Sequence, residues 1–83
     1  MRRFLAIHPV GYDKEKLGQL AKLQLPPGVT WKYTWCAVGD RKTFCEWEAP
    51  NRQALEDLFA ENNTPYEGIY EVEHYDVNSG DLD

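Results

Sequence analysis

The sequence predicts an α+β domain whose strands and helices follow the order βαββαβ. Four segments are rich in apolar, aromatic and β-branched residues, as strands are. Two stretches between them repeat apolar residues at helical spacing. Clusters of Pro, Gly and Asn separate these segments, and such clusters are typical of turns. A chain of 83 residues has room for one domain of this kind.

The first strand and the first helix are predicted near the N-terminus. Residues 4–8 are almost wholly apolar, as expected of a central strand that is covered on both faces, and Pro9 ends the run. Asp13 is a credible N-cap, because its carboxylate can accept hydrogen bonds from the first free amides of a helix. The inward face of this helix is expected to carry Leu17, Leu20, Ala21, Leu23 and Gln24. Two prolines and a glycine at residues 26–28 end it.

The remaining segments complete the pattern. Residues 29–38 and 42–49 have the composition of two strands, and the turn between them makes a hairpin. Asn51 is the expected N-cap of the second helix. The buried stripe of that helix comprises Ala54, Leu55, Leu58 and Phe59. Residues 68–77 form the last predicted strand, so we expect a domain over residues 1–77 and a polar, frayed tail over residues 78–83.

This element order has one well-known compact solution, the split βαβ or ferredoxin-like sandwich. Right-handed crossovers put the first and third strands side by side in the centre of the sheet. The expected result is a four-stranded antiparallel sheet of order 4-1-3-2. Both helices are expected to cover one face of this sheet and to leave the other face open.

The register of the central hairpin determines which residues lie on the open face. If Asp40 and Arg41 form a two-residue loop, Cys36 lies opposite Cys45. Small and apolar residues then lie under the helices, namely Cys36, Val38, Thr43, Cys45, Trp47 and Ala49. Aromatic and acidic residues lie on the open face, namely Trp31, Tyr33, Trp35, Phe44, Glu46 and Glu48.

Four exposed rings on a bare sheet would make an apolar patch too large to leave in water. A second copy of the chain stacked on this face would form a homodimer, a dimeric α+β barrel with a cavity between the two sheets. The aromatic walls and acidic rim of that cavity would suit a cationic or polarised small ligand, or a metal ion. The alternative is a face that serves dimerisation alone and holds no ligand.

The charge distribution excludes two classes of partner. The net charge is −5, with +5 in residues 1–42 and −10 in residues 43–83. Nucleic acids and anionic membrane surfaces require a basic face, and interleaved strands would mix the two halves. No apolar stretch approaches the ~20 residues that a membrane helix needs. We expect a cytoplasmic protein with no nucleic-acid or membrane partner.

The two histidines and the acidic residues near them are candidate metal ligands. His8 and His74 lie near the ends of the first and last predicted strands, and imidazole suits nickel, zinc or copper. Glu71 or Glu73 could add oxygen ligands. Both histidines could instead be structural or surface residues. Likewise, the acidic residues of the last two strands could form opposite walls of a pocket or be solvated edge charges.

The two cysteines leave three alternatives open. Cys36 and Cys45 would be cross-strand partners in the predicted register. They could be two small buried residues, a disulfide, or a metal or redox site. The spacing is not Cys-x-x-Cys, which excludes a zinc ribbon and a thioredoxin-type motif.

Three segments of the chain form a recognisable set: residues 25–31 (Leu-Pro-Pro-Gly-Val-Thr-Trp), 42–50 (Lys-Thr-Phe-Cys-Glu-Trp-Glu-Ala-Pro) and 68–72 (Gly-Ile-Tyr-Glu-Val). They resemble a family of small ferredoxin-like domains of unknown function that includes nickel-binding proteins. The most specific part is Cys-x-x-Glu-Ala-Pro at residues 45–50. The resemblance implies the fold, a dimer built on the open face, and nickel or another divalent transition metal as cofactor. It extends to His8, residues 45–50 and Glu71.

These observations support three functional hypotheses. The first is a dimeric protein that binds a small molecule or a metal ion, with nickel as the leading candidate. Its cavity would use Trp31, Tyr33, Trp35, Phe44, Glu46, Glu48 and Glu71, with His8, His74 and Glu73 as metal ligands. The second is a small cofactor-independent enzyme, an isomerase or a monooxygenase, whose base is His8 or a cavity glutamate. The third is an interaction module without a ligand.

Overall fold

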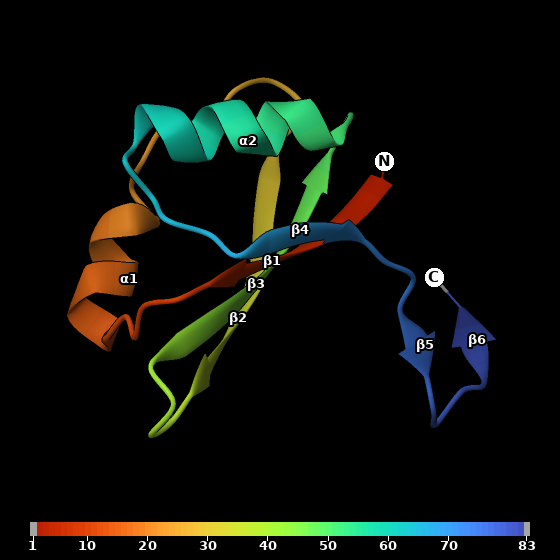
Figure 1. Ribbon diagram of the computed structural model, residues 1–83. Coiled ribbons are helices and arrows are strands. Elements are labelled where there is room, and N and C mark those ends of the chain that lie inside the picture. The colour runs from red at the N-terminus through yellow and green to blue at the C-terminus, as the bar shows by residue number, and fades with distance from the viewer. Residues whose placement is uncertain (1, 83) are drawn as a thin grey trace.

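The computed structural model describes residues 2–82, which form two helices and six strands (Figure 1). The strands are β1 (Arg2–His8), β2 (Thr30–Ala37), β3 (Lys42–Ala49), β4 (Gly68–Glu71), β5 (Tyr75–Asp76) and β6 (Asp81–Leu82). The helices are α1 (Lys14–Leu20) and α2 (Arg52–Glu61). Met1 and Asp83, the outermost residues of the predicted domain and tail, lie outside the described residues. No helix within residues 2–82 is long and apolar enough to cross a membrane.

The larger sheet is antiparallel and has the strand order β2-β3-β1-β4. On one face of the central strand β1, Phe4, Ala6 and His8 are at most 2% exposed. Its other face is half-buried and carries Arg3 and Leu5. The alternation of a strand therefore divides β1 into an apolar side and a mixed side.

The prediction of a four-stranded βαββαβ ferredoxin-like sandwich is wrong. The chain forms six strands in two sheets, and the second sheet is the two-stranded pair β5–β6. Figure 1 shows this hairpin extending from the end of β4, away from the helices. Its second strand, β6, lies within the predicted tail.

The predicted last strand is interrupted after Glu71, which lies opposite Phe4 of β1. One further contact follows, in which the Val72 amide donates to the Arg3 carbonyl at 3.0 Å. The chain then turns at Asp76, whose carboxylate accepts from the Asn78 amide at 2.8 Å. Gly80, with φ +77°, completes the reversal.

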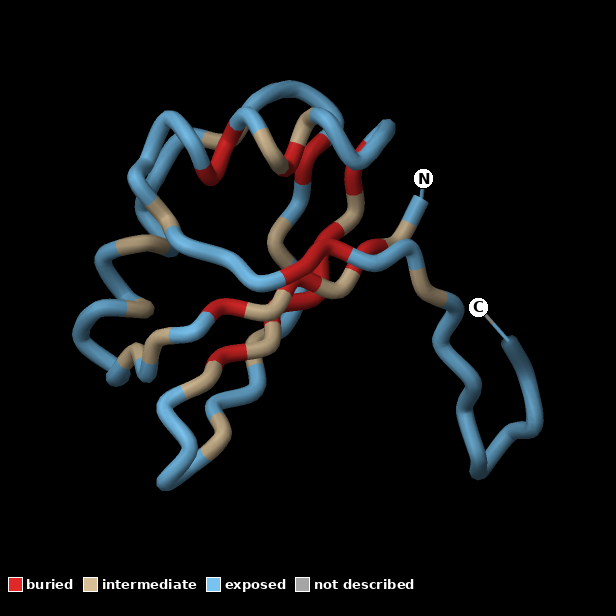
Figure 2. Tube along the Cα trace, in the orientation of Figure 1, coloured by how far each residue is buried: buried red, intermediate tan, exposed pale blue. Residues whose placement is uncertain are grey.

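The two helices differ in how they contact the sheet. In α2, Asn51 is the N-cap as predicted, and Leu55, Leu58 and Phe59 are buried. In α1, the predicted N-cap Asp13 is also confirmed, but no residue of the helix is buried. Figure 2 shows the buried residues concentrated in the sheet and on the inner side of α2. α2 therefore packs more closely on the sheet than α1 does.

The hairpin of β2 and β3 has a longer loop than predicted. Residues 38–41 form the connection, and Cys36 lies opposite Thr43 instead of Cys45. Arg41 has a positive φ of 52°, which lets a four-residue loop close the hairpin. The register is shifted by two residues, and a shift of two by itself preserves the predicted alternation of faces. Tyr33 and Trp35 thus share a face with Glu46 and Phe44.

A bulge between Trp31 and Tyr33 changes the face of one predicted residue. The extra residue, Lys32, reverses the alternation of β2 at that point. Trp31 therefore lies opposite Trp47, with ring centroids 5.7 Å apart and an interplanar angle of 14°. The prediction that Trp31 lies on the open face is wrong, because the bulge turns its ring to the helix side.

Truncation of one leucine in each helix tests this difference in packing. Leu55→Ala should lower the free energy of unfolding by about 2–5 kcal/mol, because Leu55 is fully buried against the sheet. Leu17→Ala on α1 should cost about 1 kcal/mol or less, because Leu17 remains partly exposed. Urea denaturation of both variants at one protein concentration gives the comparison. Equal losses would contradict the loose attachment of α1.

Candidate functional site

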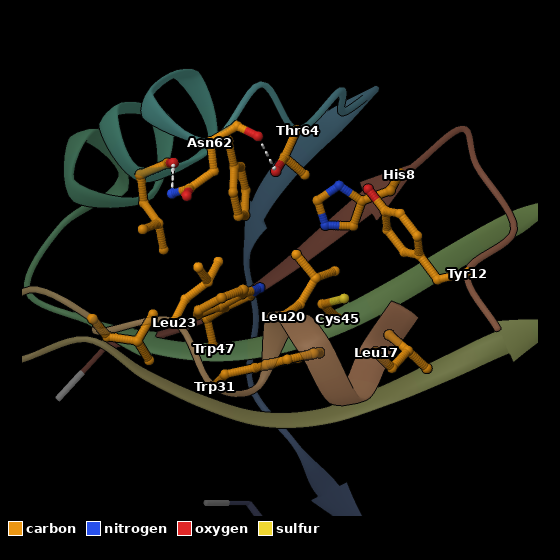
Figure 3. A pocket seen from close by; sticks show the side chains of 13 residues that line it. His8, Tyr12, Leu17, Leu20, Leu23, Trp31, Cys45, Trp47, Asn62 and Thr64 are labelled. Carbon is orange, nitrogen blue, oxygen red and sulfur yellow. Dashed lines mark hydrogen bonds between the residues drawn. The ribbon is translucent and has the colours of Figure 1, made fainter. Parts of the chain in front are cut away.

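The large sheet separates two candidate sites of different chemistry. We call the first the helix-side pocket, which lies between the sheet and the two helices (Figure 3). We call the second the open-face groove, which lies on the opposite face and contains Arg3, Trp35, Glu46 and His74. The alternation along β1 and β3 determines which residues face each site.

His8 lies at the end of β1 and faces the helix-side pocket. Its Nδ1 lies 2.8 Å from the Pro65 carbonyl oxygen, and a carbonyl can only accept, so Nδ1 carries a proton. Burial lowers the pKa of His8, which leaves the ring neutral at pH 7. Its Nε2 therefore carries a lone pair, and Figure 3 shows this nitrogen directed into the pocket. The ring packs edge-on against Phe59, with centroids 5.0 Å apart.

Cys45 ends a short chain of hydrogen bonds in the wall of the same pocket. Trp31 Nε1 donates to Thr34 Oγ1 at 2.8 Å, and Thr34 Oγ1 donates to Cys45 Sγ at 3.3 Å. Burial raises the pKa of the Cys45 thiol, which keeps it protonated. A protonated thiol is a poor nucleophile and a poor metal ligand. Both cysteines are free, so no disulfide joins Cys36 to Cys45.

Trp47 adds an indole N–H group to the helix-side pocket. Its side chain comes from β3 and is 6% exposed. Its Nε1 is buried and has no hydrogen-bond partner within residues 2–82. A buried donor without a partner costs about 1–3 kcal/mol. The rest of the lining is chiefly leucine and aromatic side chains, and the cavity has a volume of about 40 Å³.

The open-face groove consists of two adjoining hollows, of about 440 and 390 Å³, which share four residues. Tyr33 and Trp35 remain exposed beside it, by 62% and 52%. Its size falls within the range typical of ligand pockets. The residues that line it are Arg3, Leu5, Lys32, Tyr33, Trp35, Phe44, Glu46, Val72, Glu73 and His74.

Ion pairs order the charged residues of this face. Arg3 Nε lies 3.2 Å from Glu46 Oε2, and the Glu46 side chain is largely buried. Lys32, the bulge residue, places its Nζ 3.2 Å from Glu48 Oε1. The Arg3 guanidinium orients the Glu46 carboxylate by contact with one of its two oxygens. The face thus carries both positive and negative charges.

Of the predicted pocket residues, Tyr33, Trp35, Phe44 and Glu46 line the open-face groove. Glu48 lies on the same face as Glu46, two residues along β3. Two others lie elsewhere. Trp31 lies on the helix side. Glu71 lies opposite Phe4 in the β1–β4 pair and pairs with Arg2 at 2.8 Å.

The predicted metal ligands do not all come together. His8 faces the helix-side pocket, whereas His74 and Glu73 line the open-face groove, so the sheet separates the two imidazoles. Within residues 2–82, no group of three or more His, Cys, Asp or Glu side chains is placed to hold a metal ion. The helix-side pocket does not fit a metal, because its lining has no carboxylate and its thiol is protonated.

Five residues of the open face escaped the sequence prediction. Arg3, Leu5, Lys32 and Val72 line the groove, and Tyr70 lies on the same face opposite Leu5. The alternation of β1 could have identified Arg3 and Leu5, since both lie out of phase with the buried Phe4. No sequence signal marks the bulge that exposes Lys32.

The buried His8 predicts a pH dependence of stability. Its pKa is lowered in the folded chain, so the unfolded chain binds more protons below about pH 6.5. Stability should therefore fall as the pH is lowered through that value. The loss is about 1.4 kcal/mol for each pH unit between the pKa of His8 in the unfolded chain and its lower pKa in the folded chain. In His8→Asn, which keeps an N–H group near the Pro65 carbonyl, this contribution should disappear. Denaturant unfolding between pH 7 and pH 5 measures it, and an unchanged slope in the variant would refute the assignment.

One comparison identifies the family of the chain. A family model described as "Nickel responsive protein SCO4226-like" matches residues 8–72, which span the large sheet from the end of β1 and both helices. The match ends before the β5–β6 hairpin. No curated protein and no solved structure is significantly similar. Since the matched segment is most of the chain, this protein belongs to the family of SCO4226-like nickel-responsive proteins.

Proposed function

We propose that the protein binds nickel as a homodimer, in the open-face groove that a second copy of the chain closes. The observation that carries this proposal is the lining of the groove. One imidazole and two carboxylates, from His74, Glu73 and Glu46, surround a hollow beside exposed aromatic rings. The family description supports nickel as the ion.

The donor types of the groove suit a divalent transition metal. Imidazole nitrogen binds nickel well, and carboxylate oxygens complete such ligand sets. Glu46 is a candidate ligand that Arg3 holds in place, with Arg3 Nε 3.2 Å from Glu46 Oε2. A contact of this kind also orients a ligating carboxylate, as outer-shell partners do in metal sites.

A second copy would supply the donors that one chain lacks. In the described residues, one chain brings no three candidate ligands close enough together. A twofold axis through the open face would bring His74, Glu73 and Glu46 of two chains to the same cavity.

Two features of the face favour a second copy as its cover. Tyr33, Trp35 and Tyr70 are each more than half exposed, which is costly for three aromatic side chains on one side of a small sheet. The charges of the face have both signs, with Arg3 and Lys32 near Glu46. A surface with both signs of charge can be complementary to itself across a twofold axis.

Nickel titration by calorimetry tests the proposed ligands. His74→Ala and Glu73→Gln should each weaken nickel binding by more than about tenfold. Even the loss of a residue that only hydrogen-bonds to a metal ligand weakens metal binding by that factor. His8→Asn and Glu61→Gln are the matched controls, because His8 faces the opposite site and Glu61 lies at the end of α2. Both controls should bind nickel as the wild type does. Full affinity in His74→Ala, or loss in His8→Asn with retained fold, would refute the proposed site.

Sedimentation tests the dimer separately. Trp35→Glu adds a charge beside Glu46 on the open face, so it should convert the dimer into a monomer. Val38→Glu adds the same charge in the hairpin loop, where Val38 is 96% exposed, and should leave the dimer intact. A wild-type chain that sediments as a monomer with and without nickel would rule out the proposed assembly.

A further inference from the structure

We propose that the helix-side pocket is a second binding site, which takes a small neutral molecule with a hydroxyl group on an apolar body, such as a phenol. This site lies on the opposite face of the sheet from the open-face groove. It is therefore independent of the proposed nickel site and of the dimer.

The polar end of the pocket matches a hydroxyl group. Trp47 Nε1 is a buried donor without a partner in the described part of the chain, and Figure 3 shows it facing the middle of the pocket. His8 Nε2 faces the same space as an acceptor, because the Pro65 carbonyl fixes the proton on Nδ1. A hydroxyl oxygen can accept from the indole and donate to the imidazole at once.

The lining selects against charged ligands. None of the described residues that line the pocket is Asp, Glu, Lys or Arg. Transfer of an ion into such a lining would be costly, because nothing there would balance its charge. Leu20, Leu58 and Phe59 offer contact to an apolar body instead. The ligand should therefore be neutral and mostly apolar.

The size of the cavity requires one wall to move. A volume of about 40 Å³ accommodates a hydroxyl group or one water molecule, but not a six-carbon ring. α1 is the wall that can shift, because it has seven residues and none is buried. Helices this short have little stability of their own. Gly18 lies in the middle of α1, and the space where its side chain would be is empty. Displacement of α1 would let Leu17 and Leu20 close over the ligand.

NMR titration with phenol tests the site directly. Phenol should shift the indole N–H resonance of Trp47, assigned through Trp47→Phe, and leave that of the open-face Trp35 in place. Toluene has nearly the same shape and no hydroxyl, so it should bind roughly tenfold more weakly. An unmoved Trp47 resonance at saturating phenol, or equal affinities for phenol and toluene, would overturn the proposal.

Two variants separate binding from folding. Trp47→Phe removes the donor and should lower the affinity for phenol to that for toluene, with retained fold judged by circular dichroism. Leu17→Trp adds a ring to α1, outside the buried core, and should abolish binding of both compounds by filling the pocket. Leu17→Trp therefore still tests the site if Trp47→Phe unfolds the chain. Unchanged phenol binding in Leu17→Trp would place the ligand elsewhere and refute the site.

Discussion

The strict alternation of side chains along β1 and β3 is the constraint on which the rest of the structure depends. It places Phe4, Ala6 and His8 on one face of the sheet, and Arg3 and Leu5 on the other. Every functional conclusion follows from this division. One face becomes an apolar pocket with a neutral histidine, and the other becomes a groove with both signs of charge.

The division explains why the two histidines lie in different environments. His8 is buried, neutral and tied to a backbone carbonyl, so its environment disfavours the positive charge of a metal ion. His74 follows the end of β4, where the chain leaves the sheet, and it lines a groove that also contains carboxylates. Residues that look equivalent in the sequence therefore lie in environments of opposite polarity. The family description fits the second environment better than the first.

Much of the local structure could be predicted from the sequence, because it depends on neighbouring residues. Both N-caps, Asp13 and Asn51, were predicted from side chains that accept from nearby amides. The shared face of Tyr33, Trp35 and Glu46 was also correct, because an error of two residues in register preserves the alternation. The positions of α2 and of the first three strands follow from apolar patterns of the same local kind.

The remaining features depend on contacts between distant segments, which no local pattern encodes. The bulge at Lys32 is stabilised by the stacking of Trp31 on Trp47, so it appears only when the two strands meet. β4 pairs with β1 only as far as Glu71, opposite Phe4, and the separate hairpin β5–β6 follows it. Two predictions for the candidate site were wrong for this reason. Trp31 was expected on the open face but lies on the helix side, and Glu71 was expected in a pocket but pairs with Arg2.

The location of bound nickel tests the central claim most directly. Crystals grown with nickel and measured at the nickel absorption edge give an anomalous signal that locates the ion without assumptions about its ligands. The account predicts a peak on the open face, beside His74 and Glu73 and between two copies of the chain. A peak beside His8, on the helix side of the sheet, would contradict it.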